Sequence, residues 1–247
     1  MGQKPFPHIA LSCVLPVYNE EEIIDRTIRS VHAYLSGLVG DFEIVAVDDG
    51  SRDRTPEILK SLQRIYPQLR VVAHPENRGY GEALKTGYAN AGKPYVFIMD
   101  SDGQMEMRDL EAFLPLVPEF DLVIGERVRR ADAPLRTMQA RLYRFAARVL
   151  LGVPYKDLDC AFKLFKREVW EAISPLRCRG LVVSAEFIWR SMRAGFRIRQ
   201  LAVRHYPRRV GSAKAVKPSS ALRAIWELCM LWRERIGGGG RRLEDSP

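Results

Sequence analysis

The sequence predicts an α/β fold, a Rossmann-like, mostly parallel sheet with helices on both faces. Three observations predict it. Short apolar runs of strand length alternate with helical patterns through the first half of the chain. Polar residues of unusual type follow directly after these runs. The chain has 247 residues, 47% of them hydrophobic, which is enough for one large domain with a sizeable core.

The first half of the chain carries the regular alternation. Apolar and β-branched runs predict strands at residues 9–16, 42–47, 69–73, 95–99 and 121–125. Helical patterns between them predict helices at residues 20–35, 55–66, 81–91 and 108–117. In open parallel sheets of this kind, ligands bind beyond the carboxyl ends of the strands. The polar residues after the five strands are therefore expected around one crevice.

After residue 127 the alternation fails. An amphipathic helix is expected at residues 136–151, with Leu142, Phe145 and Val149 on one face. A short strand ending at Phe165, a helix at 184–193 and a strand at 197–203 follow. We expect one domain over residues 1–215, in which residues 9–127 form the ligand-binding half and residues 128–215 form a lid and platform.

A C-terminal amphipathic helix is expected at residues 216–236, followed by a disordered, glycine-rich and charged tail at 237–247. The helix carries Trp226 and Trp232 among leucines and isoleucines, with several arginines between them. This composition is typical of a helix that lies in a membrane interface. Packing onto the core and docking onto a partner membrane protein are the alternatives that the pattern leaves open.

The net charge of +9 favours an anionic partner: nucleic acid, membrane lipid or a phosphorylated substrate. No zinc finger, aromatic RNA-binding motif or long basic block is visible, so we do not expect a nucleic-acid partner. The four cysteines lie far apart without a C-x-x-C pair and are expected as reduced thiols of a cytoplasmic protein. Neither a signal peptide nor an apolar run of about 18 residues is present, which predicts peripheral contact with any membrane.

A metal site is expected directly after the strand at residues 95–99. Asp100, Asp102 and Gln104 alternate there and can present hard oxygens to one divalent cation. A calcium-binding helix-loop-helix is excluded because Met105 stands where that loop needs glycine. An Asp-x-Asp pair also occurs in solvated turns, so the interpretation depends on the other loops.

Two further loops have side chains suited to a nucleotide. Asp48 and Asp49 can accept hydrogen bonds from a base edge or a ribose hydroxyl. Residues 77–81 place a guanidinium and glycines before a helix N-terminus, where phosphate or ribose can approach the backbone. The dinucleotide fingerprint fails because Leu84 replaces its third glycine, and a Walker A loop is absent. The nucleotide is thus expected in another kind of fold.

The ordered set of motifs at residues 16–20, 48–51, 77–79 and 100–104 resembles that of the family 2 inverting nucleotide-sugar glycosyltransferases with the A-type fold. Within that family the chain is most similar to polyprenyl-phosphate sugar transferases such as dolichyl-phosphate mannose synthase. The resemblance covers roughly residues 9–215 and implies an enzyme. It makes residues 9–127 the nucleotide-sugar and metal half and residues 128–215 the acceptor half.

The resemblance also implies roles for individual residues. The metal ligands would be Asp100, Asp102 and Gln104, holding Mg²⁺ or Mn²⁺ on the diphosphate. The nucleotide-sugar ligands would be Pro16, Tyr18, Glu20, Asp48, Asp49, Arg78, Gly79, Asp100 and Ser101. The catalytic residues would be Asp102, Asp157 and Glu186, and the phosphate or acceptor ligands Arg127, Arg209 and Lys214.

The acceptor half departs from the family pattern. Ala161 and Lys163 stand where the family has glycine and arginine after the Asp157 position. Glu186 can equally be a first-turn glutamate that favours the helix dipole, and the basic loop can be a solvated surface. His205 lies in the same region, but a lone histidine is more often structural.

The expected reaction is inverting transfer of a hexose from a GDP- or UDP-linked sugar to a polyprenyl or dolichyl monophosphate, at the inner face of the membrane. Such a phosphate has a second pKa of about 6 and is already a nucleophile at neutral pH. A hydroxyl acceptor would need a carboxylate base, for which Asp157 and Glu186 are the candidates. Transfer to a polysaccharide or soluble hydroxyl acceptor is one alternative, and a non-catalytic nucleotide-sugar binding protein is the other.

Overall fold

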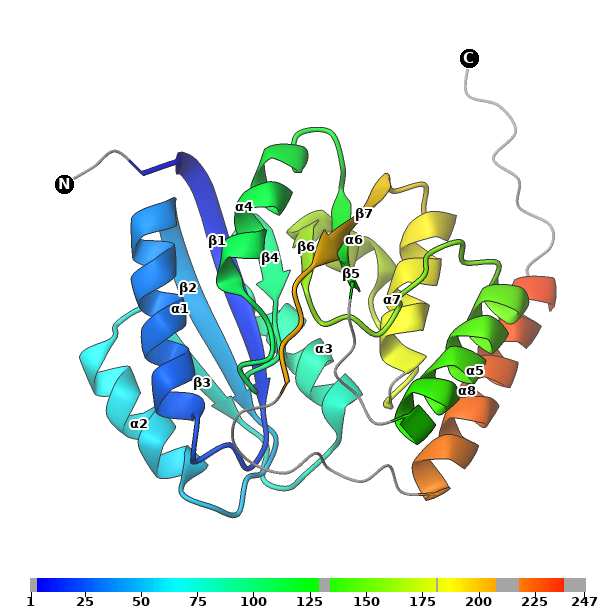
Figure 1. Cartoon of the computed structure of the whole chain (residues 1–247), viewed down its shortest axis with the longest axis horizontal. Helices are drawn as coiled ribbons and strands as arrows, with labels where there is room; N and C mark the ends of the chain where they lie inside the picture. The colour runs from blue at the N-terminus through cyan, green and yellow to red at the C-terminus, as the bar shows by residue number, and fades with distance from the viewer. Residues whose placement is uncertain (1–3, 129–133, 181, 208–217, 238–247) are drawn as a thin grey trace.

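A computed structural model describes residues 4–128, 134–180, 182–207 and 218–237. Within this part, seven strands form one sheet in the order β3-β2-β1-β4-β6-β5-β7 (Figure 1). β6 pairs antiparallel with both β4 and β5, and the other strand pairs are parallel. The predicted α/β class and mostly parallel sheet are confirmed.

The strands lie close to the predicted positions, and their buried apolar side chains stabilise them. They are β1 (Phe6–Val17), β2 (Val39–Asp48), β3 (Leu69–Ala73), β4 (Tyr95–Ile98), β5 (Leu122–Arg127), β6 (Lys163–Lys166) and β7 (Ile198–Val203). Alternate side chains of β1 enter opposite halves of the core: Leu11, Cys13 and Leu15 contribute to one and Val14 to the other. Because the central strands are buried on both faces, they are continuous apolar runs.

Helices cover both faces of the sheet (Figure 1). One face packs against α1 (Ile24–Leu38), α2 (Thr55–Ile65) and α4 (Leu110–Phe113). The other packs against α3 (Tyr80–Asn90), α5 (Pro134–Leu151), α6 (Arg167–Ile173), α7 (Val182–Arg193) and α8 (Pro218–Gly237). All four cysteines are free thiols, as predicted, and only Cys229 is exposed.

The single helix predicted at residues 108–117 is wrong. The segment is a series of short turns, η1 (Met107–Asp109), α4 and η2 (Leu114–Leu116). Pro115 lies in η2 and has no N–H to donate to the preceding turn, which favours the tighter 3₁₀ geometry there. The apolar spacing still serves its purpose, because Leu110, Phe113 and Leu114 are buried.

Strands from the second half complete the sheet made by the first. β6 inserts between β4 and β5, and β7 pairs with β5 at the edge. The chain after β6 turns directly into α6, a short helix that the sequence pattern did not predict. Residues on both sides of position 127 therefore build one continuous sheet, whose parallel strands end on the same side.

The C-terminal helix α8 has two apolar faces. Glu227, Leu228 and Leu231 are buried against the domain. Leu222, Ile225, Trp226, Trp232 and Ile236 lie on the opposite side of the helix and are exposed. Arg235 fixes α8 to α5 by donating hydrogen bonds to the carbonyls of Val149 and Leu150. One face of the helix is thus core, and the other is not covered by the residues that the structure describes.

Candidate active site at the carboxyl edge of the sheet

The predicted metal loop follows β4 and is held by hydrogen bonds to neighbouring elements. Ser101 is buried, and its hydroxyl donates a hydrogen bond to the carbonyl of Pro16 at 2.9 Å, while Thr27 donates to the Ser101 carbonyl. Gly103 has φ +72°, and a Cβ there would lie 2.7 Å from Ile23. Ser101 thus supports the loop through its own hydrogen bonds, and the residues on either side of it carry the ligand-binding side chains.

The side chains of Asp102 and Gln104 are held in defined orientations. Asp102 Oδ1 accepts a hydrogen bond from the Gln104 N–H at 3.1 Å. The Gln104 side-chain nitrogen donates to the carbonyl of Tyr206 at 2.9 Å, which leaves its amide oxygen as the ligand atom. The neighbouring Met105 forms a β-bridge with His205. The segment after β7 is thereby fixed beside the loop.

Asp100 combines burial with a like-charged neighbour. Its Oδ1 accepts a hydrogen bond from the Tyr80 hydroxyl at 3.1 Å. Burial and the nearby Asp102 carboxylate raise the pKa of Asp100 to about 6. A divalent cation would offset both effects, because it supplies the positive charge that the two carboxylates lack.

The donor set fits Mg²⁺ or Mn²⁺. Asp100, Asp102 and Gln104 offer two carboxylates and one amide oxygen, all hard ligands. No group of three or more His, Cys, Asp or Glu side chains in the described residues, at this loop or elsewhere, is arranged to hold a metal. Three protein oxygens leave coordination positions for water and for phosphate oxygens, as in sites where Mg²⁺ is bound through a nucleotide.

The first two nucleotide loops are bonded into one unit. The Asn19 N–H donates to the Ser51 hydroxyl, and the Arg52 N–H donates to the Asn19 side chain. The Glu20 N–H donates to the Thr55 hydroxyl. Asn19 has φ +51°, a left-handed conformation that asparagine tolerates. Pro16, Tyr18 and Glu20 are thereby placed beside the Asp48 loop, as the parallel β1–β2 pair requires.

Asp49 organises the next loop. Its Oδ1 bonds to His74 Nδ1 at 2.7 Å and accepts from the Arg78 N–H at 2.9 Å. Its Oδ2 accepts from the Gly79 N–H at 2.9 Å. Since both oxygens are engaged, Asp49 positions Arg78 and Gly79, which leaves Asp48 as the better candidate for direct contact with the nucleoside. Asp48 Oδ1 accepts the Ser51 N–H, and the residue is buried.

His74 and Tyr80 are site residues that sequence reasoning missed. His74 is buried after β3 and bridges Asp49 to the Thr86 hydroxyl on α3, with Nε2 2.9 Å from it. Tyr80, the first residue of α3, reaches Asp100. His74 directly follows β3, and Tyr80 directly follows the motif at residues 77–79. These positions are the sequence signal from which both residues could have been identified.

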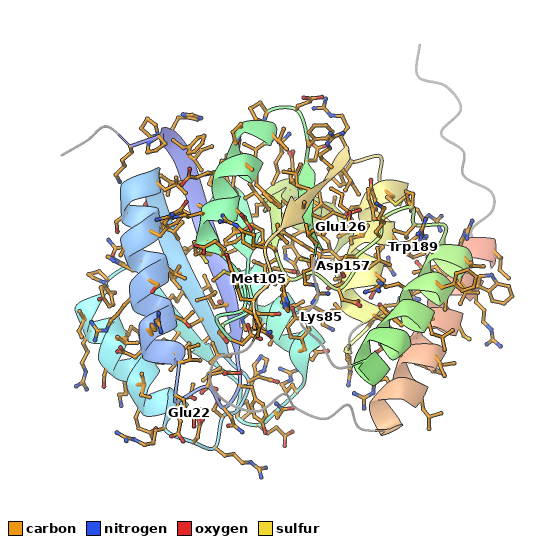
Figure 2. All side chains as sticks on the ribbon, in the orientation of Figure 1. Glu22, Lys85, Met105, Glu126, Asp157 and Trp189 are labelled. Carbon is orange, nitrogen blue, oxygen red and sulfur yellow. The ribbon has the colours of Figure 1, made fainter. Side chains whose placement is uncertain are left out.

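Asp157 forms a buried ion pair at the end of β5. Arg127 donates from Nε and Nη2 to the two Asp157 oxygens, both at 2.8 Å, and its N–H also donates to Oδ2. The two side chains are only 12% and 6% exposed. Figure 2 shows Asp157 beside Glu126, near the middle of the molecule. Because Arg127 engages both Asp157 oxygens, the carboxylate is oriented toward the guanidinium, an arrangement that disfavours a general-base role for Asp157.

Buried ionisable groups continue along the segment after Asp157. Asp159 Oδ1 is buried without a hydrogen-bond partner in the described part of the chain. Burial and the neighbouring Asp157 raise the pKa of Asp159 to about 6. Lys163 is 2% exposed, donates to the Cys160 carbonyl and lies 3.4 Å from Ser184, and burial lowers its pKa. Lys163, the substitute for the family's arginine, is therefore an internal cation.

Glu186 is enclosed in the protein. It is fully buried on α7 and accepts hydrogen bonds from the backbone N–H groups of Arg177 and Cys178 and from the Arg190 side chain. These contacts tie α7 to the preceding segment. These contacts give Glu186 a structural role and disfavour it as a general base.

The predicted phosphate ligands Arg209 and Lys214 lie outside the described residues. The described segment before them ends at residue 207, directly after Tyr206, which is hydrogen-bonded to Gln104 in both directions. Of the predicted tail at residues 237–247, Gly237 is the last residue of α8, and the rest lies outside the described part. No helix within that part combines the length and apolar character needed to cross a membrane.

Comparison with known sequences agrees with this geometry. The model of the family described as "Glycosyl transferase family 2" matches residues 12–174. Glycosyltransferase AglD of Haloferax volcanii is 32% identical over 242 residues, which are 92% of this chain and 38% of that protein. Undecaprenyl-phosphate 4-deoxy-4-formamido-L-arabinose transferase of Pseudomonas aeruginosa is 34% identical over 179 residues, 71% of this chain and 52% of that protein. The chain spans about half or less of these relatives.

Solved structures show the same fold. Glucosyl-3-phosphoglycerate synthase of Mycobacterium tuberculosis in complex with Mn²⁺ and UDP-glucose superposes with a TM-score of 0.65 at 21% identity, over 97% of this chain and 81% of that one. Its complex with Mn²⁺, UDP and glucosyl-3-phosphoglycerate gives a TM-score of 0.64 at 22% identity, over 97% and 82%. The likeness at these identities concerns the arrangement of the sheet and helices.

Proposed function

The chain belongs to glycosyl transferase family 2 and has the A-type glycosyltransferase fold, and from that premise we propose that it transfers a hexose from a nucleotide sugar to a polyprenyl monophosphate with inversion. The carboxyl edge of the sheet is the donor site. Asp48 and the loop at residues 16–20 contact the nucleoside, and Arg78 and Gly79, positioned by Asp49, approach the ribose or phosphates. The base is guanine or uracil.

The diphosphate leaves from the loop after β4. Asp100, Asp102 and Gln104 would hold Mg²⁺ or Mn²⁺, which would supply Lewis-acid chemistry to the diphosphate leaving group when bound. Tyr80 keeps Asp100 aimed at the ligand, and Tyr206 keeps the Gln104 amide turned. Arg209 and Lys214 would add positive charge to the leaving diphosphate. A single displacement on the opposite side of the sugar inverts the anomeric configuration.

The contacts of the two candidate bases are the observation from which we choose the acceptor. Asp157 is paired with Arg127 through both oxygens, and Glu186 is buried among its hydrogen-bond donors. Neither carboxylate is arranged to take a proton from an acceptor hydroxyl. A phosphate monoester needs no such base, because it is largely dianionic above its second pKa of about 6. The engaged carboxylates therefore favour a phosphate acceptor, a class also named in the Pseudomonas relative.

We further propose that the enzyme works at the inner face of the membrane, attached peripherally by α8. Trp226 is 65% exposed and Trp232 40% exposed, on the helix face opposite to the buried one. Trp226→Glu should weaken binding to vesicles, whereas Ile65→Glu on α2, where the native side chain is 55% exposed, should not. Vesicle flotation of the two variants is the measurement, and equal loss in both would contradict the assignment to α8.

The identity and anomeric configuration of the product test the proposed reaction. The full chain is incubated with GDP- and UDP-linked hexoses, Mn²⁺ or Mg²⁺ and a short-chain polyprenyl phosphate, and the sugar phosphate formed is analysed by NMR. We expect one nucleotide sugar to give a glycosyl phosphate of inverted anomeric configuration. A product of retained configuration would contradict the single displacement.

A further inference from the structure

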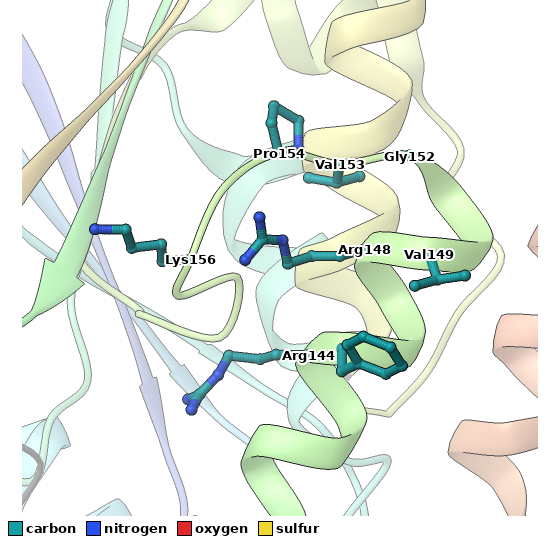
Figure 3. Close-up of a pocket in the computed structure, with 8 residues that line it drawn as sticks. Arg144, Arg148, Val149, Gly152, Val153, Pro154 and Lys156 are labelled. Carbon is teal, nitrogen blue, oxygen red and sulfur yellow. The ribbon is translucent and has the colours of Figure 1, made fainter.

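A basic hollow of about 580 Å³ lies between α5 and the segment at residues 152–156 that follows it (Figure 3). Its charged lining consists of Arg144, Arg148 and Lys156. Phe145 and Val149 contribute apolar side chains from the same helix. None of these residues belongs to the donor loops described above, so the hollow needs an explanation of its own.

The cations of this hollow are only weakly compensated. Arg144 approaches Asp157 at 3.9 Å, at the limit of an ion pair, and Asp157 already binds Arg127 closely. Lys156, whose side chain is 73% exposed, lies 3.7 Å from Glu126. Arg148 is exposed and pairs with no carboxylate of the described residues. Figure 3 shows Arg144 and Arg148 projecting from the same side of α5, the side on which Lys156 lies. An anion would complete this arrangement.

An apolar surface adjoins the cations. Leu142, Phe145 and Val149 form a stripe along α5 and are 70%, 66% and 59% exposed. α5 packs against α8, whose exposed face carries five further large hydrophobic residues. Eight of the eleven exposed large hydrophobic residues in the described chain lie on these two helices. A monomeric soluble protein rarely exposes so many apolar side chains together.

We propose that this hollow binds the phosphate headgroup of an anionic membrane phospholipid, while Phe145, Val149 and the neighbouring α8 face enter the upper acyl region. The proposal rests on the membrane location proposed above. The pairing of unneutralised arginines with exposed aromatic and aliphatic side chains on one helix matches both layers of an anionic bilayer surface. A soluble phosphate compound would match the arginines and leave the apolar stripe in water.

Headgroup binding at this place would orient the catalytic site. Arg144 touches both the hollow and Asp157, and Asp157 holds Arg127 at the end of β5. Arg127, which the sequence predicts as a phosphate or acceptor ligand, is thus connected to the hollow through two ion pairs that share Asp157. A lipid-linked acceptor phosphate could then reach it without leaving the interface.

Charge reversal at the hollow tests the proposal. The variant Arg148→Glu/Lys156→Glu spares Arg144, which contacts Asp157. The control Lys60→Glu/Arg64→Glu changes the same number of exposed charges on α2, at the opposite end of the molecule (Figure 1). Vesicles of phosphatidylcholine with about one quarter phosphatidylglycerol are compared with pure phosphatidylcholine by co-sedimentation. We expect the partition coefficient of the hollow variant onto anionic vesicles to fall about tenfold or more. The partition coefficient of the control should fall at most about threefold.

Three results would overturn the proposal. The first is equal loss in both variants, which would indicate a general charge effect. The second is equal binding of the native chain to both kinds of vesicle. The third is unchanged vesicle binding by the hollow variant together with a raised KM for a detergent-dispersed short-chain prenyl phosphate, which would assign the hollow to the acceptor. Vesicle binding needs no turnover, so failure of the proposed reaction would be seen separately. The thermal unfolding midpoint of each variant checks its fold.

Discussion

The active site has two sides: the donor edge, with Asp48, Asp49 and Asp102, and the β5 side, with Arg127, Asp157 and Asp159. The carboxylates on these two sides are held in different ways. At the donor edge, Asp48, Asp49 and Asp102 accept hydrogen bonds from backbone N–H groups within their own or adjacent loops. On the β5 side, Asp157 is held mainly by the Arg127 side chain, and Asp159 has an oxygen without a partner. Backbone donors keep their geometry without a counter-charge. The folding stability of the donor edge should therefore depend little on the charges of its carboxylates, and the folding stability of the β5 side should depend on them strongly.

The largest effect is expected at the metal loop. Asp102→Asn should lower kcat/KM by about a thousandfold, because an amide both weakens the metal site and lacks the charge that it needs. The fold should be preserved, since an amide oxygen can still accept the Gln104 N–H. Steady-state kinetics and urea unfolding measure the two quantities. Activity of the Asp102→Asn variant in excess chelator would contradict the assignment of this loop as a metal site.

Asp157→Asn should be the most destabilising of the carboxylate substitutions. It leaves the Arg127 guanidinium buried beside a neutral partner, at a cost of about 3 kcal/mol in the free energy of unfolding. The control is Asp25→Asn, which breaks an exposed pair with Arg29 whose side chains are 51% and 48% exposed, and should cost less than about 0.5 kcal/mol. Equal values from denaturant titration would remove the distinction between the two sides.

Asp159→Asn should stabilise the protein in a pH-dependent way. Burial and Asp157 raise the pKa of Asp159 from 3.8 to about 6, so the folded state binds the extra proton between these values. Ionisation of Asp159 therefore destabilises the folded protein as pH rises through about 6. The variant should gain up to about 2–3 kcal/mol above pH 7 and nothing below about pH 4. A stability difference that does not vary with pH would contradict the assignment.

The smallest effect is expected at His74. His74→Gln keeps a side chain that can bond to Asp49 or Thr86 but not to both in the same geometry, which loosens the loop at Arg78 and Gly79. We expect the KM for the nucleotide sugar to rise about threefold to tenfold while kcat changes less than about twofold. A lowered kcat at unchanged KM would show that His74 acts in the chemical step.

The donor edge was predictable from the sequence because its information is local. Strands buried on both faces are visible as apolar runs, and the polar motifs follow them directly, so a parallel sheet brings them together. The hydrogen-bonded role of Asp49 was not predictable, since it depends on His74 and Thr86 from separate elements. The β6 insertion was missed for the same reason, because strand order is a long-range property.

The β5 side was predicted less well because its residues are similar in type but different in environment. Asp157 and Glu186 both read as possible bases, and only tertiary packing shows that one is ion-paired and the other is buried among N–H donors. The two faces of α8 pose the same difficulty. Leu231 and Trp232 are adjacent apolar residues, yet the first is fully buried and the second is 40% exposed.

The most direct test of the account is to offer the full chain two acceptors that differ in one group. A polyprenyl monophosphate and the corresponding polyprenol carry the same chain, and only the polyprenol needs a base to become nucleophilic. With Mn²⁺ and the nucleotide sugar that supports turnover, we expect transfer to the phosphate and at least about a thousandfold slower transfer to the alcohol. Comparable kcat/KM values for the two acceptors would contradict the central claim that this site needs no general base.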